Sequence, residues 1–210
     1  MDECDVCQEF STGICEILTP PQSRILYDSK DTVITPALGS FIEGYVIIWS
    51  RQHYPSMASM GVEGLRSLAD LLPMIRQVIT DAYTAPVIFE HGATTNSGRG
   101  GACIDHAHLH VVACSVDLLP RLQEVGPTRT LAGWQNLDRF CDRPYLLYGP
   151  SDSEMLYICE KPSIRSQYLR KALAEATGHQ DSWDWLAYLG IAEMMRTYDK
   201  LKPIIKARGR

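Results

Sequence analysis

The sequence predicts a mixed α/β or α+β domain with one sheet, and three observations lead to this class. Short apolar runs at residues 44–50 and 85–92 have the length and flanking residues of buried strands. Between them, residues 62–83 carry apolar side chains at helical spacing. A glycine-rich loop over residues 93–102 is followed by another strand. The order strand, helix, strand, loop, strand is typical of a sheet with a packed amphipathic helix.

The helix predicted over residues 62–83 has one apolar face, and Pro73 is a possible kink in it. The apolar face consists of Leu65, Leu68, Leu72, Ile75 and Ile79. Strands are expected at "PYLLYG", residues 144–149, and "EMLYICEK", residues 154–161.

Two further helices are expected in the second half of the chain. One begins at Pro162 and ends near Gly178, because proline favours a first turn and glycine a C-terminus. The other spans residues 181–201 and is capped by Asp181 or Ser182. Its expected apolar side consists of Leu189, Met194, Met195 and Tyr198. Gly126 and Pro127 mark a loose boundary between a core domain, residues 1–126, and an extension, residues 127–210.

Composition excludes several classes of protein. The chain has 210 residues and a formal net charge of -5, without a dominant basic tract, which argues against a non-specific nucleic-acid binder. It lacks a run of about 18 apolar residues, so no membrane span is expected. Its start is acidic and does not resemble a secretory signal. Seven cysteines without an export signal predict free thiols in a reducing cytoplasm, apart from metal ligands.

The stretch "DHAHLHVVA", residues 105–113, carries three histidines at alternate positions. On a strand, His106, His108 and His110 share one face, about 6.5–7 Å apart, while the apolar residues between them face the core. Such a row of imidazoles can bind metal, or it can provide a nucleophile and a proton donor for phosphate chemistry.

The sequence "HAHLHVV", residues 106–112, resembles the signature of the histidine triad superfamily. The segments at residues 37–53 and 87–108 also resemble the strand-turn-strand and phosphate-loop segments of this superfamily, especially in galactose-1-phosphate uridylyltransferase-like relatives and in long bacterial members with a zinc knuckle. The resemblance covers residues 1 to about 114 well and the rest weakly. It implies an α+β fold of histidine triad type, with an antiparallel sheet, a packed amphipathic helix and a C-terminal α/β extension.

The resemblance also implies roles for the triad. His108 would attack the α-phosphorus of a nucleotide and form a nucleotidyl-histidine intermediate, and the carbonyl of His106 would hold its other ring nitrogen protonated. His110 would contact the phosphate or assist the leaving group. The loop would offer backbone N–H groups and an arginine to the phosphates. Its candidate residues are Asn96, Ser97, Gly98, Arg99, Gly101, Ala102 and Cys103. A thiol is a weak donor, which puts a phosphate contact from the side chain of Cys103 in doubt.

Cys4 and Cys7, in "CDVC", have the spacing of a zinc knuckle, although one such pair can also be a redox pair or a chance occurrence. The resemblance supplies two more ligands, His53 in "SRQH" and His106. The resulting Cys2His2 site would hold a structural Zn²⁺, because four protein ligands leave no open position.

Several residues outside these motifs are further candidates for roles at the site. Many relatives have an asparagine that contacts the phosphate near the sequence position of His91. His91 could bind substrate in its place, replace a metal ligand or have no role. Glu90 could orient it or bind a second metal. Ser166 and Gln167, with Arg170 on the same helix face, could contact the phosphate or leaving group, or could simply be exposed.

The expected activity is hydrolysis of a nucleoside phosphate or dinucleoside polyphosphate. The uridylyltransferase branch has glutamine at the third triad position, whereas this chain has His110, which favours hydrolysis or another nucleotidyl transfer. A nucleotidyltransferase or phosphorylase with a non-water acceptor, and a non-catalytic nucleotide-binding module, remain alternatives. The expected partner is a small nucleotide rather than nucleic acid or a membrane, and relatives are commonly homodimers.

Overall fold

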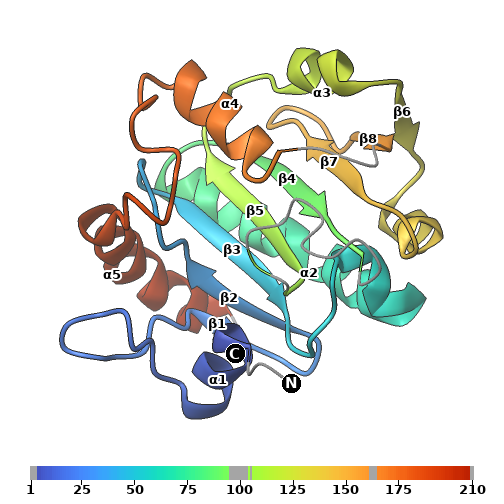
Figure 1. Cartoon of the computed structure of the whole chain (residues 1–210). Helices are drawn as coiled ribbons and strands as arrows, with labels where there is room; N and C mark the ends of the chain where they lie inside the picture. Colours follow the sequence, from blue (N-terminus) through green and yellow to red (C-terminus); the bar gives the residue numbers. More distant parts are fainter. Residues whose placement is uncertain (1–3, 95–103, 105, 161–164, 209–210) are drawn as a thin grey trace.

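A computed structural model of the chain describes residues 4–94, 104, 106–160 and 165–208. Eight strands in this part form one antiparallel sheet in the order β1-β2-β3-β5-β4-β7-β8-β6 (Figure 1). The strands are β1 (Tyr27–Asp28), β2 (Thr32–Pro36), β3 (Tyr45–Ser50), β4 (Pro86–Gly92), β5 (His108–Ala113), β6 (Thr128–Leu131), β7 (Tyr145–Gly149) and β8 (Leu156–Glu160). The α+β class is therefore confirmed.

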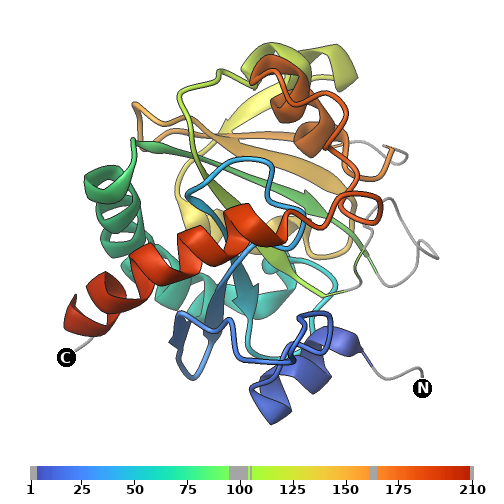
Figure 2. The ribbon, with the colours of Figure 1, turned by 90° about the vertical axis from the view of Figure 1, so that its left-hand side faces the viewer.

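Two apolar layers lie on opposite faces of the sheet. The first contains α2 (Gly61–Ala82) and α5 (Ile191–Arg208), with short 3-10 helices at Met57–Met60 and Trp134–Phe140. The predicted apolar face of α2 is buried, and Pro73 lies inside this continuous helix. Figure 2 shows α5 crossing beside the strands, and its buried residues Leu201 and Ile205 join the same layer.

The second layer contains α1 (Asp5–Thr12), α3 (Leu119–Val125) and α4 (Tyr168–Ala176). These helices pack on the face of β3, β4 and β5 that carries the histidines of the triad. In Figure 1, α4 lies near one end of β5 and α1 lies beyond the opposite end of β3. Residues of α1 and α4 line one cleft on this face together with His108 and His110.

The segments before and after the expected boundary at residues 126 and 127 both contribute strands to one sheet. Strand β7, from the predicted extension, pairs with β4 over Ile88–Gly92. The extension thus continues the sheet of the first half, and α4 returns to the histidine face.

Two expected helix starts are wrong. The helix expected from Pro162 begins at Tyr168, with residues 161–164 outside the described part, and Gly178 follows its end with φ 77°. The helix expected from residue 181 begins at Ile191. Residues 181–190 form turns instead, because side chains of α4 and the residue before it bind this backbone. The Nε of Arg170 donates to the carbonyl of Trp183, and Oε1 of Gln167 accepts the backbone N–H of Trp185.

The end of this turn segment also cannot belong to a helix. Gly190 has φ 56°, and a Cβ there would lie 1.9 Å from the carbonyl oxygen of Ser40. The chain can make this close contact only with glycine, so the helix starts one residue later. Leu189, expected on the apolar face of the helix, is 36% exposed.

Candidate functional site

The three triad histidines follow the alternation that the sequence predicts. In the register of β3 and β5, His108 lies opposite Trp49, and His110 lies opposite Ile47. Leu109 between them is buried in the other apolar layer. His106 lies just before β5, fully buried, and its ring turns toward the N-terminal cysteines.

The Nδ1 atom of His108 lies 2.7 Å from the carbonyl oxygen of His106. A carbonyl oxygen can only accept, so Nδ1 carries the proton and Nε2 keeps its lone pair. Burial lowers the pKa of His108, which keeps the ring neutral. The ring packs on Trp49 with 5.2 Å between centroids and lines a cleft. His108 is therefore a neutral imidazole with a fixed orientation and an available lone pair.

His110 lies beside His108, with 4.9 Å between the ring centroids. Its ring stacks on Phe89 at 4.5 Å, and its Nδ1 lies 2.8 Å from the hydroxyl of Tyr45. Burial, followed by the charges of His108 and Arg170, lowers the pKa of His110 well below its usual value. Neutral His110 is thus held beside His108 by Phe89 and Tyr45.

The cleft over these histidines has a volume of about 670 Å³, within the range of small-molecule sites. Its floor is formed by side chains of β3, β4 and β5. Residues of α1, of the segment from Ile14 to Ile17, of α4 and of the turn at Trp185 and Leu186 form the walls. The cleft is thus large enough for a nucleotide and has both histidines at its base.

Four possible metal ligands converge at one end of this face. The ligand atoms of Cys4, Cys7, His53 and His106 all lie within 4.8 Å of one another. Nδ1 of His106 is 3.5 Å from Sγ of Cys4 and 3.6 Å from Sγ of Cys7, and Nδ1 of His53 is 3.6 Å from Sγ of Cys7. A tetrahedral ion with zinc–ligand bond lengths separates sulfur and nitrogen by about 3.6 Å. The four residues fit a metal ion of this geometry.

The surroundings of His106 also suit a metal ligand. Its Nε2–H donates to the carbonyl oxygen of Ser50 at 2.7 Å, so Nδ1 faces the thiols as a lone pair. Phe10 and Trp49 pack edge-on against the ring at 5.8 and 6.0 Å between centroids. The ring is therefore held in position by contacts that do not involve the cysteines.

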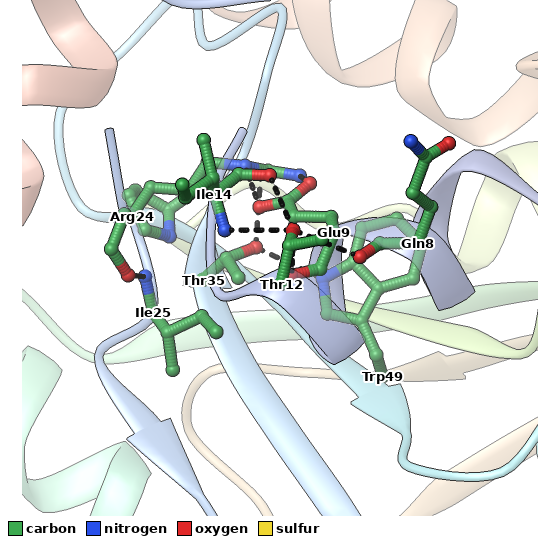
Figure 3. A network of polar contacts seen from close by, with 10 residues as sticks. Gln8, Glu9, Thr12, Ile14, Arg24, Ile25, Thr35 and Trp49 are labelled. Carbon is green, nitrogen blue, oxygen red and sulfur yellow. Dashed lines mark hydrogen bonds and ion pairs between the residues drawn. The ribbon is translucent and has the colours of Figure 1, made fainter. Parts of the chain in front are cut away.

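A buried ion pair anchors the helix that carries Cys7 (Figure 3). Arg24 donates from Nε and from one terminal nitrogen to the two carboxylate oxygens of Glu9, both at 2.8 Å. Its other terminal nitrogen donates to the hydroxyl of Thr35, which also accepts from the indole of Trp49. This network connects α1 to β2 and β3, beside His106 and His108. The sequence reasoning missed it, because an isolated acid and base reveal no pairing.

The other predicted site residues have different positions. Asn96, Ser97, Gly98, Arg99, Gly101, Ala102 and Cys103 lie outside the described residues. His91 and Gln167 line the cleft. Gln167 has φ 60° and holds the turn at Trp185, and its Nε2 donates to Asp184. Ser166 is not among the residues that line the cleft.

Two residues of the cleft bury a ring nitrogen that lacks a hydrogen-bond partner within the described part of the chain. They are His91, at Nδ1, and Trp185, at Nε1. Burial lowers the pKa of His91 to about 4, so its ring is neutral at pH 7. An unpaired buried polar atom costs free energy, and a bound polar group would relieve that cost.

Glu90 does not orient His91. Its two carboxylate oxygens accept from the backbone N–H of Met57 and from the hydroxyl of Tyr145, both at 2.7 Å. Neighbouring residues on a strand point to opposite faces, and Glu90 lies on the face away from the cleft. Burial raises its pKa to about 7. The suggestion that it binds a second metal has no support, since no metal-ligand cluster among the described residues includes it.

Comparisons with known proteins found similarity to solved structures only. No family model and no curated protein matches the chain. Among solved structures, a hypothetical histidine triad nucleotide-binding protein from Sulfolobus tokodaii is 16% identical, with 52% of this chain and 68% of that chain covered and a TM-score of 0.41. A HIT family protein from Bacillus anthracis is 15% identical, with 53% and 73% covered and a TM-score of 0.42.

A HIT family hydrolase from Clostridium thermocellum is 16% identical, with 56% of this chain and 95% of that chain covered and a TM-score of 0.40. The names of these proteins refer to the histidine triad family, whose sequence signature the motif at residues 106–112 resembles. At such identities and TM-scores, the likeness does not assign an activity to this chain.

No helix within the described residues is long and apolar enough to cross a membrane.

Proposed function

We propose that the protein is a histidine triad enzyme that hydrolyses a nucleoside phosphate or dinucleoside polyphosphate through a nucleotidyl-histidine intermediate. The observation that supports this proposal most is the hydrogen bond from Nδ1 of His108 to the carbonyl oxygen of His106, with 2.7 Å between the two atoms. It leaves the Nε2 lone pair of a neutral imidazole available in a cleft of nucleotide size.

The reaction would proceed in two displacements at phosphorus. Nε2 of His108 attacks the α-phosphorus, forming a P–N bond as the P–O bond to the leaving phosphate breaks. Water then attacks the same phosphorus, the P–N bond breaks, and the nucleoside monophosphate leaves with a proton released to solvent. His110 provides a hydrogen bond to the phosphate or leaving group. We assign further substrate contacts to His91 and Gln167, which line the cleft, and to the loop residues 96–103.

We further propose that Cys4, Cys7, His53 and His106 hold a structural Zn²⁺. Two thiolates and two imidazoles form a donor set that zinc prefers, and four protein ligands leave no position for substrate. When bound, the ion would cross-link α1 to the start of β5. The residues that do chemistry would be His108 and His110, while His106 provides its carbonyl to His108 and its ring to the metal. Thiols stay reduced in a reducing compartment, for which we propose the cytoplasm.

The experiment is incubation of the purified protein with dinucleoside polyphosphates, nucleotide sugars and nucleoside phosphoramidates, followed by mass spectrometry of the products. We expect a nucleoside monophosphate from the wild type and none from His108→Ala. His179→Ala is the matched control, since this histidine does not line the cleft. It should retain activity.

The other outcomes distinguish the alternatives. An adduct on His108 without turnover would identify a nucleotidyltransferase or phosphorylase that lacks its acceptor. Binding of nucleotides that is unchanged in His108→Ala, with neither adduct nor turnover, would indicate a non-catalytic binding module and contradict the proposal. The homodimer implied by the resemblance stays a prediction, which light scattering in solution would test.

A further inference from the structure

We infer that Tyr45 and Arg170 fix His110 in the tautomer that carries its proton on Nε2, which is opposite to the tautomer of His108. Both are positioning residues that act through His110, and neither is assigned to the site by the triad motif. The catalytic consequence rests on the proposed function, but the tautomer itself can be measured without a substrate.

The hydroxyl of Tyr45 is the first part of this arrangement. Tyr45 lies on β3, is fully buried, and its oxygen is 2.8 Å from Nδ1 of His110. A pair at this distance shares one proton, so either the hydroxyl donates to Nδ1 or the ring N–H donates to the hydroxyl oxygen. The choice depends on what else the hydroxyl meets.

Arg170, on α4, lies beside the Tyr45 ring. Its guanidinium carbon lies 5.4 Å from the centroid of the Tyr45 ring and 5.0 Å from that of Phe41. The charge of Arg170 and a hydrogen bond from it both lower the pKa of Tyr45, against the stronger effect of burial. Arginine has only donors, so Arg170 cannot accept the hydroxyl proton of Tyr45.

The direction of the bond between Tyr45 and His110 follows. Among the described residues, Nδ1 of His110 is the acceptor bonded to the Tyr45 hydroxyl. An outward-turned hydroxyl would leave its proton buried and unpaired, at a free-energy cost. The hydroxyl therefore donates to Nδ1, and the neutral ring carries its proton on Nε2.

Arg170 itself is held firmly for this role. It is 4% exposed, and it donates to the carbonyls of Trp183 and Gly39. No carboxylate within the described ranges lies within ion-pair distance of it. A buried cation without a neutralising partner disfavours a second positive charge on His110, and Arg170 accordingly lowers the pKa of that ring.

The result is a division of roles between adjacent rings of one strand. His108 carries its proton on Nδ1 and offers a lone pair at Nε2, whereas His110 offers an N–H donor at Nε2. Nε2 of His110 has no hydrogen-bond partner in the described part of the chain, and the residue lines the cleft. It can donate a hydrogen bond to a phosphate oxygen, without proton transfer, while His108 attacks.

The test is NMR spectroscopy of histidine labelled with ¹⁵N in the metal-loaded protein without substrate. Long-range ¹H–¹⁵N correlations should show the Nδ1–H tautomer for His108 and the Nε2–H tautomer for His110 near pH 7. A wild-type His110 with its proton on Nδ1 would overturn the inference. Failure of the proposed function alone would appear as lost turnover with both tautomers as stated.

Tyr45→Phe removes only the donor, and it should give a mixed tautomer for His110. At equal tautomer populations kcat should fall about twofold, because only molecules with the Nε2–H tautomer donate to the phosphate. Tyr148→Phe is the matched control, because this buried tyrosine bonds to the loop at Val116 instead. It should leave the His110 spectrum unchanged. An unchanged His110 tautomer in folded Tyr45→Phe would contradict the role of the hydroxyl.

Arg170→Lys tests the second positioning residue. If it folds, the retained positive charge should keep His110 neutral, but loss of the fixed guanidinium should broaden or mix its tautomer signals. If Arg170→Lys does not fold, Tyr45→Phe still decides the inference. Wild-type tautomer signals in a folded Arg170→Lys protein would remove Arg170 from the account.

Discussion

The Nδ1 atom of His108 donates to the carbonyl oxygen of His106, whose own ring faces Cys4 and Cys7. One residue therefore connects a metal-type cluster with the proposed nucleophile, through its ring on one side and its backbone on the other. The position of His106 in the metal cluster therefore affects the orientation of the His108 ring. None of the four ligands needs to touch the substrate for this effect.

Loss of the cysteines should reduce stability and metal content together. In Cys4→Ser/Cys7→Ser, we expect zinc to fall from one ion per chain to none and the free energy of unfolding to fall by roughly 3 kcal/mol or more, since metal binding free energy contributes to folding. Elemental analysis and thermal unfolding would measure both. Cys141→Ser, at an exposed cysteine, should change neither. A double variant with full zinc content would refute the ligand assignment.

Breaking the ion pair between Glu9 and Arg24 should destabilise the protein strongly. Glu9→Gln leaves a buried guanidinium without its charge partner, which costs about 3–5 kcal/mol when an ion pair is this buried. Urea unfolding would measure the change. Glu63→Gln, in an exposed pair with Arg66, should cost less than about 1 kcal/mol. Equal effects of the two substitutions would show that the buried network does not anchor α1.

Glu90 should make the protein less stable as pH rises. Burial raises its pKa to about 7 from 4.5, so the folded state binds the proton more tightly than the unfolded state. Its contribution is most favourable below pH 4.5 and is lost as pH rises to about 7. Glu90→Gln, which mimics the neutral carboxyl, should flatten this dependence and stabilise the protein at pH 8 by up to about 3 kcal/mol.

Urea unfolding of the wild type and Glu90→Gln at pH 5 and pH 8 would measure the difference. If the free energy of unfolding depends on pH in the same way for both proteins, Glu90 is ionised in the folded state across this range. That result would contradict the raised pKa of Glu90.

His91 should affect substrate affinity more than stability. His91→Phe removes a buried nitrogen that has no partner among the described residues, so thermal stability should be unchanged or slightly raised. If this nitrogen binds the substrate, KM should rise about tenfold for the loss of one hydrogen bond. Steady-state kinetics with thermal unfolding would separate the two effects. A large loss of stability with unchanged KM would indicate a structural residue.

The sequence predicts those parts of the site that depend on local periodicity. Alternation on β5 places His108 and His110 on one face because a strand repeats every two residues. The same rule, applied to β4, could have shown that Glu90 and His91 point to opposite faces. The spacing of Cys4 and Cys7 marks one pair of ligands, but the addition of His53 and His106 follows only from the family resemblance, since both lie far from that pair in the chain.

Other parts depend on contacts between distant segments. Arg170 reaches Tyr45 across 125 positions, and Glu9 pairs with Arg24 through a turn that no local pattern marks. The start of α5 was misplaced for the same reason: residues 181–190 suit a helix locally, but Gln167 and Arg170 bind their backbone in turns. Tertiary hydrogen bonds here override local propensity.

The most direct test of the central claim is intact-protein mass spectrometry after brief incubation with the nucleotide that the wild type turns over, with denaturation above neutral pH because a P–N bond hydrolyses in acid. We predict a mass increase of one nucleotidyl group, located by fragmentation on His108 and absent from His108→Ala. Turnover that persists in His108→Ala, or an adduct on another residue, would contradict the assignment of His108 as the nucleophile.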